Sequence, residues 1–101
     1  MILSGLASPA ELQGAVRDAM VARRLALNMT QVVLAARSGV SLDSLRRFER
    51  IAEISLASLV RLAMALDCAD GLSGLFPAPE MRRLDDLIAK PAVRRRARRK
   101  G

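Results

Sequence analysis

The sequence contains no histidine, tryptophan or tyrosine, and it has one cysteine, Cys68, and two phenylalanines. These absences exclude a structural zinc site, which takes four Cys or His ligands, and a Ser-His or Cys-His nucleophile pair. A lone cysteine cannot form an internal disulfide, which fits a reducing compartment. No glycine-rich run resembles a phosphate-binding loop. We therefore expect neither an enzyme nor a bound metal or cofactor.

Long hydrophobic runs are absent as well. The longest uncharged stretch near the middle of the chain covers residues 25–36, well short of the roughly 20 apolar residues that a membrane-spanning helix needs. The first residues lack the basic region of a secretory signal. We therefore expect no membrane segment.

The positive charge of the chain, +7 overall, is concentrated at its C-terminal end. Seven of the 17 Lys and Arg residues lie within residues 90–101, so residues 1–89 hold ten basic and ten acidic side chains. A segment so rich in arginine repels itself and has little to bury, and we expect residues 90–101 to be a disordered basic tail. Such a tail serves either as an electrostatic arm for nucleic acid or as an aid to solubility.

The hydrophobic fraction of 51%, with almost no aromatic residues, favours one small all-α domain. Ser8, Pro9 and Glu11 form a helix start with a capping box. Behind them, apolar residues recur every three to four positions. The expected apolar, core-facing side of this helix consists of Leu12, Val16, Ala19, Met20 and Leu27.

Further capping residues divide the rest of the chain into short helices. They predict helices over residues 31–37, with Val32 or Val33 available to the core, over 42–50 and over 56–66, then a short fifth helix and an amphipathic segment over 80–89. The predicted caps are Thr30, Ser41, Ser55 and Asp70. In the fifth helix, the side chains expected to point inward are those of Leu72, Leu75 and Phe76.

Residues 30–50 have the layout of a helix-turn-helix unit. A seven-residue helix is followed by a turn at Gly39, which suits a positive φ, and by a second helix. Ala35 is small where the two helices cross. Leu45 and Phe48, three residues apart, anchor the second helix to the rest of the domain. The opposite face of that helix is left outward and is free to enter a DNA major groove.

On these residues the chain resembles the lambda-repressor-like, Cro-type helix-turn-helix family of bacterial regulators. The resemblance covers about residues 16–76. It implies a DNA-binding domain of five short helices, which we assign to residues 8–76, and a location in the bacterial cytoplasm at the nucleoid. The matching residues are Arg24, Thr30, Gln31, Leu34, Ala35, Ser38 to Ser41, Leu45, Phe48 to Arg50, Ser55, Leu56, Leu59, Leu62, Ala63, Ala65 and Leu66.

The resemblance places the base-reading residues on the outward face of the second helix. Arg46 and Arg47 are the best candidates for bidentate contact with guanine. Asp43 would either accept a hydrogen bond from a cytosine amino group or stabilise the helix N-terminus, and Leu42 would touch a thymine methyl group. Ser44 completes this face.

Phosphate contacts are implied beside these base contacts. Gln31, at the start of the first helix of the unit, would donate a hydrogen bond to a phosphate, helped by the helix N-terminus. Arg37 and Arg50 are the other phosphate candidates. The resemblance also implies an ion pair between Arg24 and Glu49 with a structural role. We expect this pair to be partly buried and to orient the second helix.

The chain departs from the family's pattern at two places. The family often has Glu two or three positions after the threonine cap, where this chain has Val32 and Val33. The family also tends to place Gly after the Glu-Arg pair, where this chain has Ile51 and Ala52. The second departure affects the exit from the helix and therefore the direction of Arg50.

A narrower resemblance concerns residues 48–76 and the sequence that follows them, including Leu84 to Leu87 and the basic end. This region is similar to HipB-like antitoxins, the DNA-binding halves of toxin–antitoxin pairs whose toxin is a HipA-like kinase. It implies a protein that represses its own operon and binds the kinase. One alternative is an orphan transcriptional regulator. The other is a protein-interaction module without operator binding, which the neutral net charge of residues 1–89 supports. The scarcity of aromatic residues argues against a reader of single-stranded RNA.

A homodimer is expected, because one helix-turn-helix rarely supplies enough contacts and a dimer reads two half-sites of a palindromic operator. The candidate interface consists of apolar residues that so small a domain cannot all bury. They alternatively complete the core of the monomer. They lie at the end of the domain and in a C-terminal extension over 77–89, and they are Leu72, Leu75, Phe76, Leu84, Leu87 and Ile88.

Overall fold

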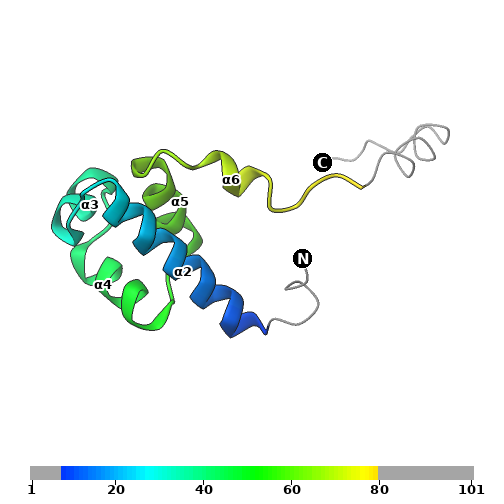
Figure 1. The fold of residues 1–101 in the computed structure, drawn as a ribbon, viewed down its shortest axis with the longest axis horizontal. Helices are drawn as coiled ribbons and strands as arrows, with labels where there is room; N and C mark the ends of the chain where they lie inside the picture. The colour runs from blue at the N-terminus through cyan, green and yellow to red at the C-terminus, as the bar shows by residue number, and fades with distance from the viewer. Residues whose placement is uncertain (1–7, 80–101) are drawn as a thin grey trace.

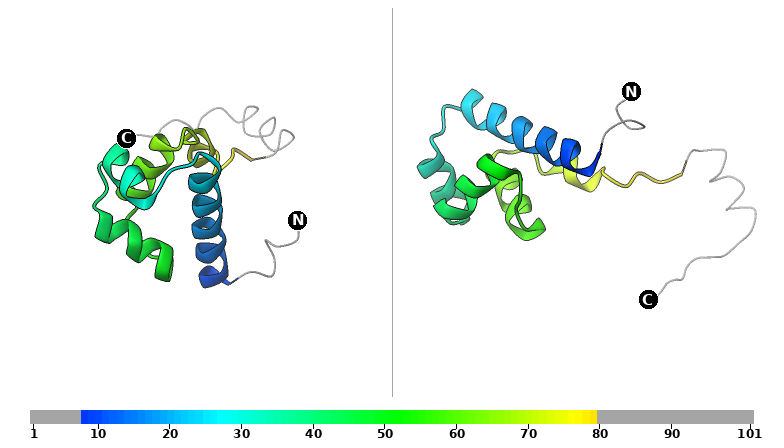
Figure 2. Two further views of the ribbon diagram at one scale, coloured as in Figure 1. Left: turned by 60° about the vertical axis from the view of Figure 1, so that its left-hand side comes forward. Right: turned by 90° about the horizontal axis from the view of Figure 1, so that it is seen from below.

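The computed structural model describes residues 8–79, and within this range it contains five helices and no strand (Figure 1). This agrees with the predicted all-α fold. Two further views show the longest helix beside the cluster of the next three (Figure 2). Helix α3 packs against both α4 and α5, and α2 packs against α4. The helices are α2 (Pro9–Ala26), α3 (Gln31–Ser38), α4 (Leu42–Ile51), α5 (Leu56–Ala65) and α6 (Asp70–Ser73).

Helices α2 to α5 each begin at a hydroxyl side chain, as the sequence predicts. The Ser8 N–H donates to Glu11 Oε1 at 2.8 Å and the Glu11 N–H donates to Ser8 Oγ at 3.1 Å, which completes the capping box. Thr30, Ser41 and Ser55 each accept a hydrogen bond at 3.1 Å from the backbone N–H three residues later. Each cap satisfies a donor that the first turn of a helix leaves free.

The core lies where α3, α4 and α5 meet the middle of α2. Its side chains are aliphatic, with one phenylalanine, and nearly all solvent is excluded from them. Because the helices are short, a few leucines carry most of the packing. The most deeply buried residues are Leu34, Leu45, Leu62, Leu66, Phe48 and Val40.

The prediction that five residues of the first helix form a buried apolar face is wrong for most of them. Of its members only Met20 is buried, whereas Leu12, Val16 and Leu27 are each about 45% exposed and Ala19 is also exposed. The reason is that α2 directs polar side chains toward α4, described below, and this rotates its apolar stripe away from the centre of the core. Periodicity alone does not distinguish the two orientations.

Helix α3 also differs from expectation. Leu34 and Ala35 enter the core, but Val32 and Val33 are 58% and 37% exposed. Neither valine therefore contributes to the core.

The end of the domain departs furthest from expectation. Asp70 is the first residue of α6 rather than its cap, and Ala69 at the cap position makes no side-chain hydrogen bond. Leu72 is half-buried, but Leu75 and Phe76 are 59% and 92% exposed, so the expectation that both point inward is wrong. The helix is only four residues long, and after it the chain leaves the helical body (Figure 1).

The remaining C-terminal predictions lie outside the described residues. They are the amphipathic segment over 80–89, with the interface residues Leu84, Leu87 and Ile88, and the basic tail over 90–101.

Candidate DNA interface

The turn between α3 and α4 is formed by Ser38, Gly39 and Val40. Gly39 takes a left-handed conformation with φ at 78°, and its N–H donates to the Ala35 carbonyl. A Cβ at this position would meet no atom within 4 Å, so the glycine is needed for its backbone conformation and not for space. The Val40 N–H donates to Ser38 Oγ at 3.1 Å. With the Val40 side chain buried, the turn fixes the angle between the two helices.

Helix α4 buries one face and exposes the other. Leu45 and Phe48 are 0% and 2% exposed and attach the helix to the core. The side chains of Arg46, Arg47 and Arg50 on the rest of the helix are exposed. Three cations on one exposed helical surface create a positive potential that attracts a polyanion.

The two neighbouring arginines, Arg46 and Arg47, differ in their contacts. Arg47 Nη2 lies 2.8 Å from Glu53 Oε1, and both side chains are more than half exposed. No ion pair involves Arg46 among the interactions of residues 8–79. Arg46 is therefore open to a ligand, while Arg47 must first leave Glu53. An exposed pair of this kind is weak.

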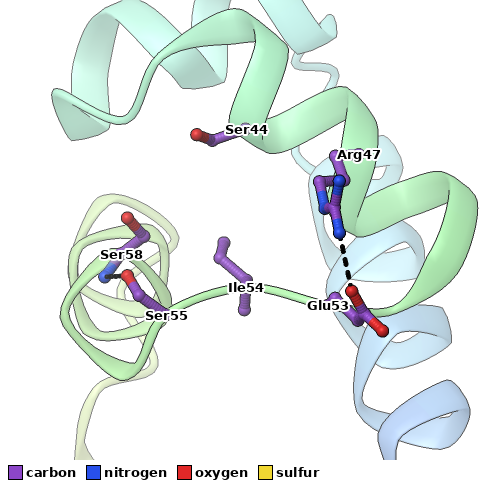
Figure 3. Close-up of a pocket in the computed structure, with 6 residues that line it drawn as sticks. All are labelled: Ser44, Arg47, Glu53, Ile54, Ser55 and Ser58. Atoms are coloured by element: carbon purple, nitrogen blue, oxygen red, sulfur yellow. Dashed lines mark hydrogen bonds and ion pairs between the residues drawn. The ribbon is translucent and has the colours of Figure 1, made fainter.

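A hollow of about 390 Å³ separates α4 from the start of α5, with the Arg47–Glu53 pair on one side of it (Figure 3). Ile54 extends between the two helices. The rest of the wall is formed by serines and by the ion pair, so polar groups and apolar surface both lie beside Arg47. The lining residues are Ser44, Arg47, Glu53, Ile54, Ser55 and Ser58.

The first turn of α4 holds three of the predicted contact residues. Asp43 is exposed. It lies in the first turn of α4, where the helix dipole stabilises a carboxylate. Ser44 Oγ accepts a hydrogen bond at 2.9 Å from Ser41 Oγ, which ties it to the cap. Leu42 is half-buried and packs against the core, so only part of its side chain can touch a ligand.

The structure brings Arg24 and Glu49 together. Arg24 Nε and Nη2 lie 2.8 and 2.9 Å from the two carboxylate oxygens of Glu49, and the side chains are 9% and 12% exposed. Arg24 Nη1 donates to the Met29 carbonyl at 3.0 Å. Gln31 Nε2 donates to Glu49 Oε1 at 2.9 Å. One of the two amide hydrogens of Gln31 is therefore held inside the domain, and the other remains for an outside ligand.

Two residues that sequence reasoning missed also hold α4 in place. Arg17 Nη1 donates to the Glu49 carbonyl at 2.9 Å, and Gln13 Nε2 donates to the Ala52 carbonyl at 3.2 Å. These bonds satisfy carbonyls at the C-terminal end of α4, which have no partner within the helix. The signal was present in the spacing, because Gln13, Arg17 and Arg24 fall four and seven residues apart on one face of α2.

The exit from α4 keeps a left-handed cap without a glycine. Ala52 has φ at 59° and ψ at 33°, and its N–H donates to the Phe48 carbonyl at 2.8 Å. The conformation costs more for alanine than for glycine. The substitution therefore changes the energy of the exit and not its geometry, and Arg50 remains exposed in the last turn.

Residues 21–70 match the model of the family described as Helix-turn-helix. No curated protein and no solved structure matches the chain. In the part of the chain that the structure describes, no helix is long and apolar enough to cross a membrane. The matched region contains the whole of α3, the turn and α4, and it supports a DNA-binding transcription regulator. Together, the match and the all-helical fold identify a helix-turn-helix domain of the lambda-repressor-like type.

Proposed function

We propose that this protein is a sequence-specific, dimeric transcriptional repressor that inserts α4 into the DNA major groove. The observation that carries the proposal is the two-sided character of α4. Leu45 and Phe48 are almost fully buried, while Arg46, Arg47 and Arg50 are exposed. A helix fixed on one side and cationic on the other has the form of a recognition helix.

The arginines divide into base readers and phosphate contacts. Arg46, which has no ion-pair partner within residues 8–79, would read guanine with two hydrogen bonds. Arg47 would do so after leaving Glu53. Arg37 and Arg50 would contact phosphates, which position the protein without reading sequence.

The other predicted contacts support this arrangement. Gln31 would give its second amide hydrogen to a phosphate at the N-terminus of α3, where the helix dipole favours an anion. Asp43 would stabilise the α4 N-terminus or accept from cytosine, and Leu42, half-buried, would touch a thymine methyl group with its exposed part.

A homodimer would supply the second half-site. The exposed Leu75 and Phe76 favour this proposal, because a monomer gains nothing from a phenylalanine ring left in water. With Leu72 they would belong to an interface that continues into Leu84, Leu87 and Ile88. Two copies would place two α4 helices in successive major grooves of a palindromic operator.

Within this function we propose the role of an antitoxin that represses its own operon and binds a HipA-like kinase. The support is the resemblance of residues 48–76, and of the segment that follows, to HipB-like antitoxins. An orphan regulator is the competing proposal. Co-purification with the product of the neighbouring reading frame decides between them: a stable complex with a kinase-like protein supports the antitoxin, and a neighbour unrelated to kinases contradicts it.

The DNA proposal is tested by selecting binding sites from a random duplex library with the full chain. We expect a palindromic site bound by two copies. Arg46→Ala should lose preference at one base position of each half-site, whereas Arg37→Ala should weaken all duplexes alike. Equal loss on selected and random duplexes for Arg46→Ala would contradict its assignment. Failure to select any site would favour an interaction module.

A further inference from the structure

An apolar groove of about 270 Å³ lies between α2, α5 and α6. A second hollow of about 250 Å³ shares Val16 and Leu59 with it and extends it toward Ala52. The one charged residue lining the first hollow is Arg23. Its guanidinium donates to the Leu66 and Asp67 carbonyls at 2.6 and 3.0 Å. The groove therefore offers mainly apolar surface, and its one cationic side chain is held by two backbone carbonyls.

Within residues 8–79, no segment covers the apolar stripe of α2, and the groove is open in this part of the chain. Val16 is 46% exposed, and Ala19 beside it is also exposed. On the other wall, Leu59 and Ala63 come from α5, and Cys68 and Leu72 follow that helix. Apolar side chains along two walls gain stability when a further apolar group removes them from water.

A short arm, residues 74–79, carries apolar side chains without burying them. Phe76 is 92% exposed and Leu75 is 59% exposed. Pro77 and Pro79 disfavour a helical backbone at the residue before each of them. The arm runs from α6 away from α5, in Figure 1 and in the right-hand view of Figure 2. The arm thus does not fill the groove of its own domain.

We propose that the arm of one copy lies in the α2–α5 groove of a second copy, and that the second copy returns the same contact. This inference rests on the dimer of the proposed function, and in it the α2–α5 groove is the surface that receives the partner's arm. A twofold exchange is self-complementary, because arm and groove belong to the same chain. Phe76 would enter the groove beside Val16 and Ala19, and Leu75 would approach Cys68.

Two observations favour a second copy over other occupants. The described chain ends at Pro79, after a segment that runs away from α5 (Figure 1), and 22 residues continue from that point. Because two prolines restrict its backbone, the arm also loses less conformational freedom on binding than a segment without proline.

The sole cysteine of the chain provides a direct test. In Leu75→Cys, mild oxidation should join Cys68 of one copy to residue 75 of the other, because a disulfide requires the two Cα atoms to be within about 7 Å. We expect a covalent dimer in non-reducing electrophoresis, and peptide mapping should find the 68–75 link. The dimer band should vanish when Cys68→Ser is added. Ala36→Cys, an exposed position on α3, controls for random collision and should stay monomeric.

A matched pair of alanines tests the groove without cysteine chemistry. Ala19 and Ala22 are both exposed on α2, but only Ala19 lines the groove. In sedimentation experiments on the full chain, Ala19→Glu should weaken the dimer by at least about tenfold, whereas Ala22→Glu should leave it unchanged. Circular dichroism should show that both variants keep the helical fold.

Three outcomes would overturn the exchange: a monomeric parent protein, an intrachain 68–75 disulfide, or equal dimer strength in the two glutamate variants. An intrachain disulfide would mean that the arm covers its own groove. Site selection separates these results from the DNA function. Operator binding by a dimer that tolerates Ala19→Glu would refute the exchange and leave the repressor intact. A groove-dependent dimer that selects no site would refute the repressor and leave the exchange.

Discussion

The carboxylate of Glu49 receives the guanidinium of Arg24 from a position 25 residues earlier, through two bonds of 2.8 and 2.9 Å. Gln31 adds a third donor to the same carboxylate. One side chain of α4 is thus bonded to α2 and to α3. The position of α4 depends on this junction as well as on the buried Leu45 and Phe48.

Arg24→Ala should destabilise the domain by about 3 kcal/mol, because removing one partner leaves the other charge buried. Urea unfolding followed by circular dichroism measures the loss. The matched control is Glu53→Ala, which breaks the exposed Arg47–Glu53 pair and should cost less than about 1 kcal/mol. An Arg24→Ala protein as stable as its parent would show that the junction does not hold the fold.

Glu53→Gln should strengthen DNA binding several-fold at low salt. The change removes a negative charge beside α4 and releases the guanidinium of Arg47, which lies 2.8 Å from the carboxylate. The gain should shrink as salt rises, since exposed charges are screened. Fluorescence anisotropy on a selected duplex measures it, with Asp70→Asn on α6 as a control of equal charge. Weaker binding would mean instead that Glu53 holds Arg47 in its contacting position.

The sequence was sufficient where a structural feature depends on neighbouring residues. The caps at Thr30 and Ser41 each bond a backbone N–H three residues away, and the burial of Leu45 and Phe48 follows from helical spacing. The same local patterns define the helix-turn-helix and the exposed face of α4, so most of the candidate interface was predictable.

The sequence was insufficient where orientation depends on distant contacts. Arg17 and Gln13 bond carbonyls 32 and 39 residues away, and these contacts turn the apolar stripe of α2 toward a groove. A stripe with Val16 in it looks the same whether it enters a core or lines an open surface. Leu75 and Phe76 follow a helix of only four residues, too short for periodicity to fix which way they point.

Ala52→Gly should stabilise the protein by up to about 1 kcal/mol, because glycine adopts the left-handed conformation without the clash that alanine bears there. The φ of 59° at Ala52 identifies the strained residue. Thermal unfolding measures the gain. The control is Ala36→Gly in the interior of α3, which should lower stability by about the same amount. A loss of stability in Ala52→Gly would mean that the methyl group contributes more by packing than it costs in strain.

Neutralising the C-terminal arginines should reduce the salt dependence of DNA binding while leaving the preferred sequence unchanged. In the full chain, glutamine would replace Arg94, Arg95, Arg96, Arg98 and Arg99. Each lost phosphate contact lowers the magnitude of the slope of log affinity against log salt by about 0.9, so five lost contacts should lower it by up to roughly 4.5. The Arg61→Gln variant on α5 controls for a general loss of charge and should change the slope by less than about 1. An unchanged slope in the five-fold variant would assign the tail to solubility, and a changed base preference would move part of the recognition from α4 to the tail.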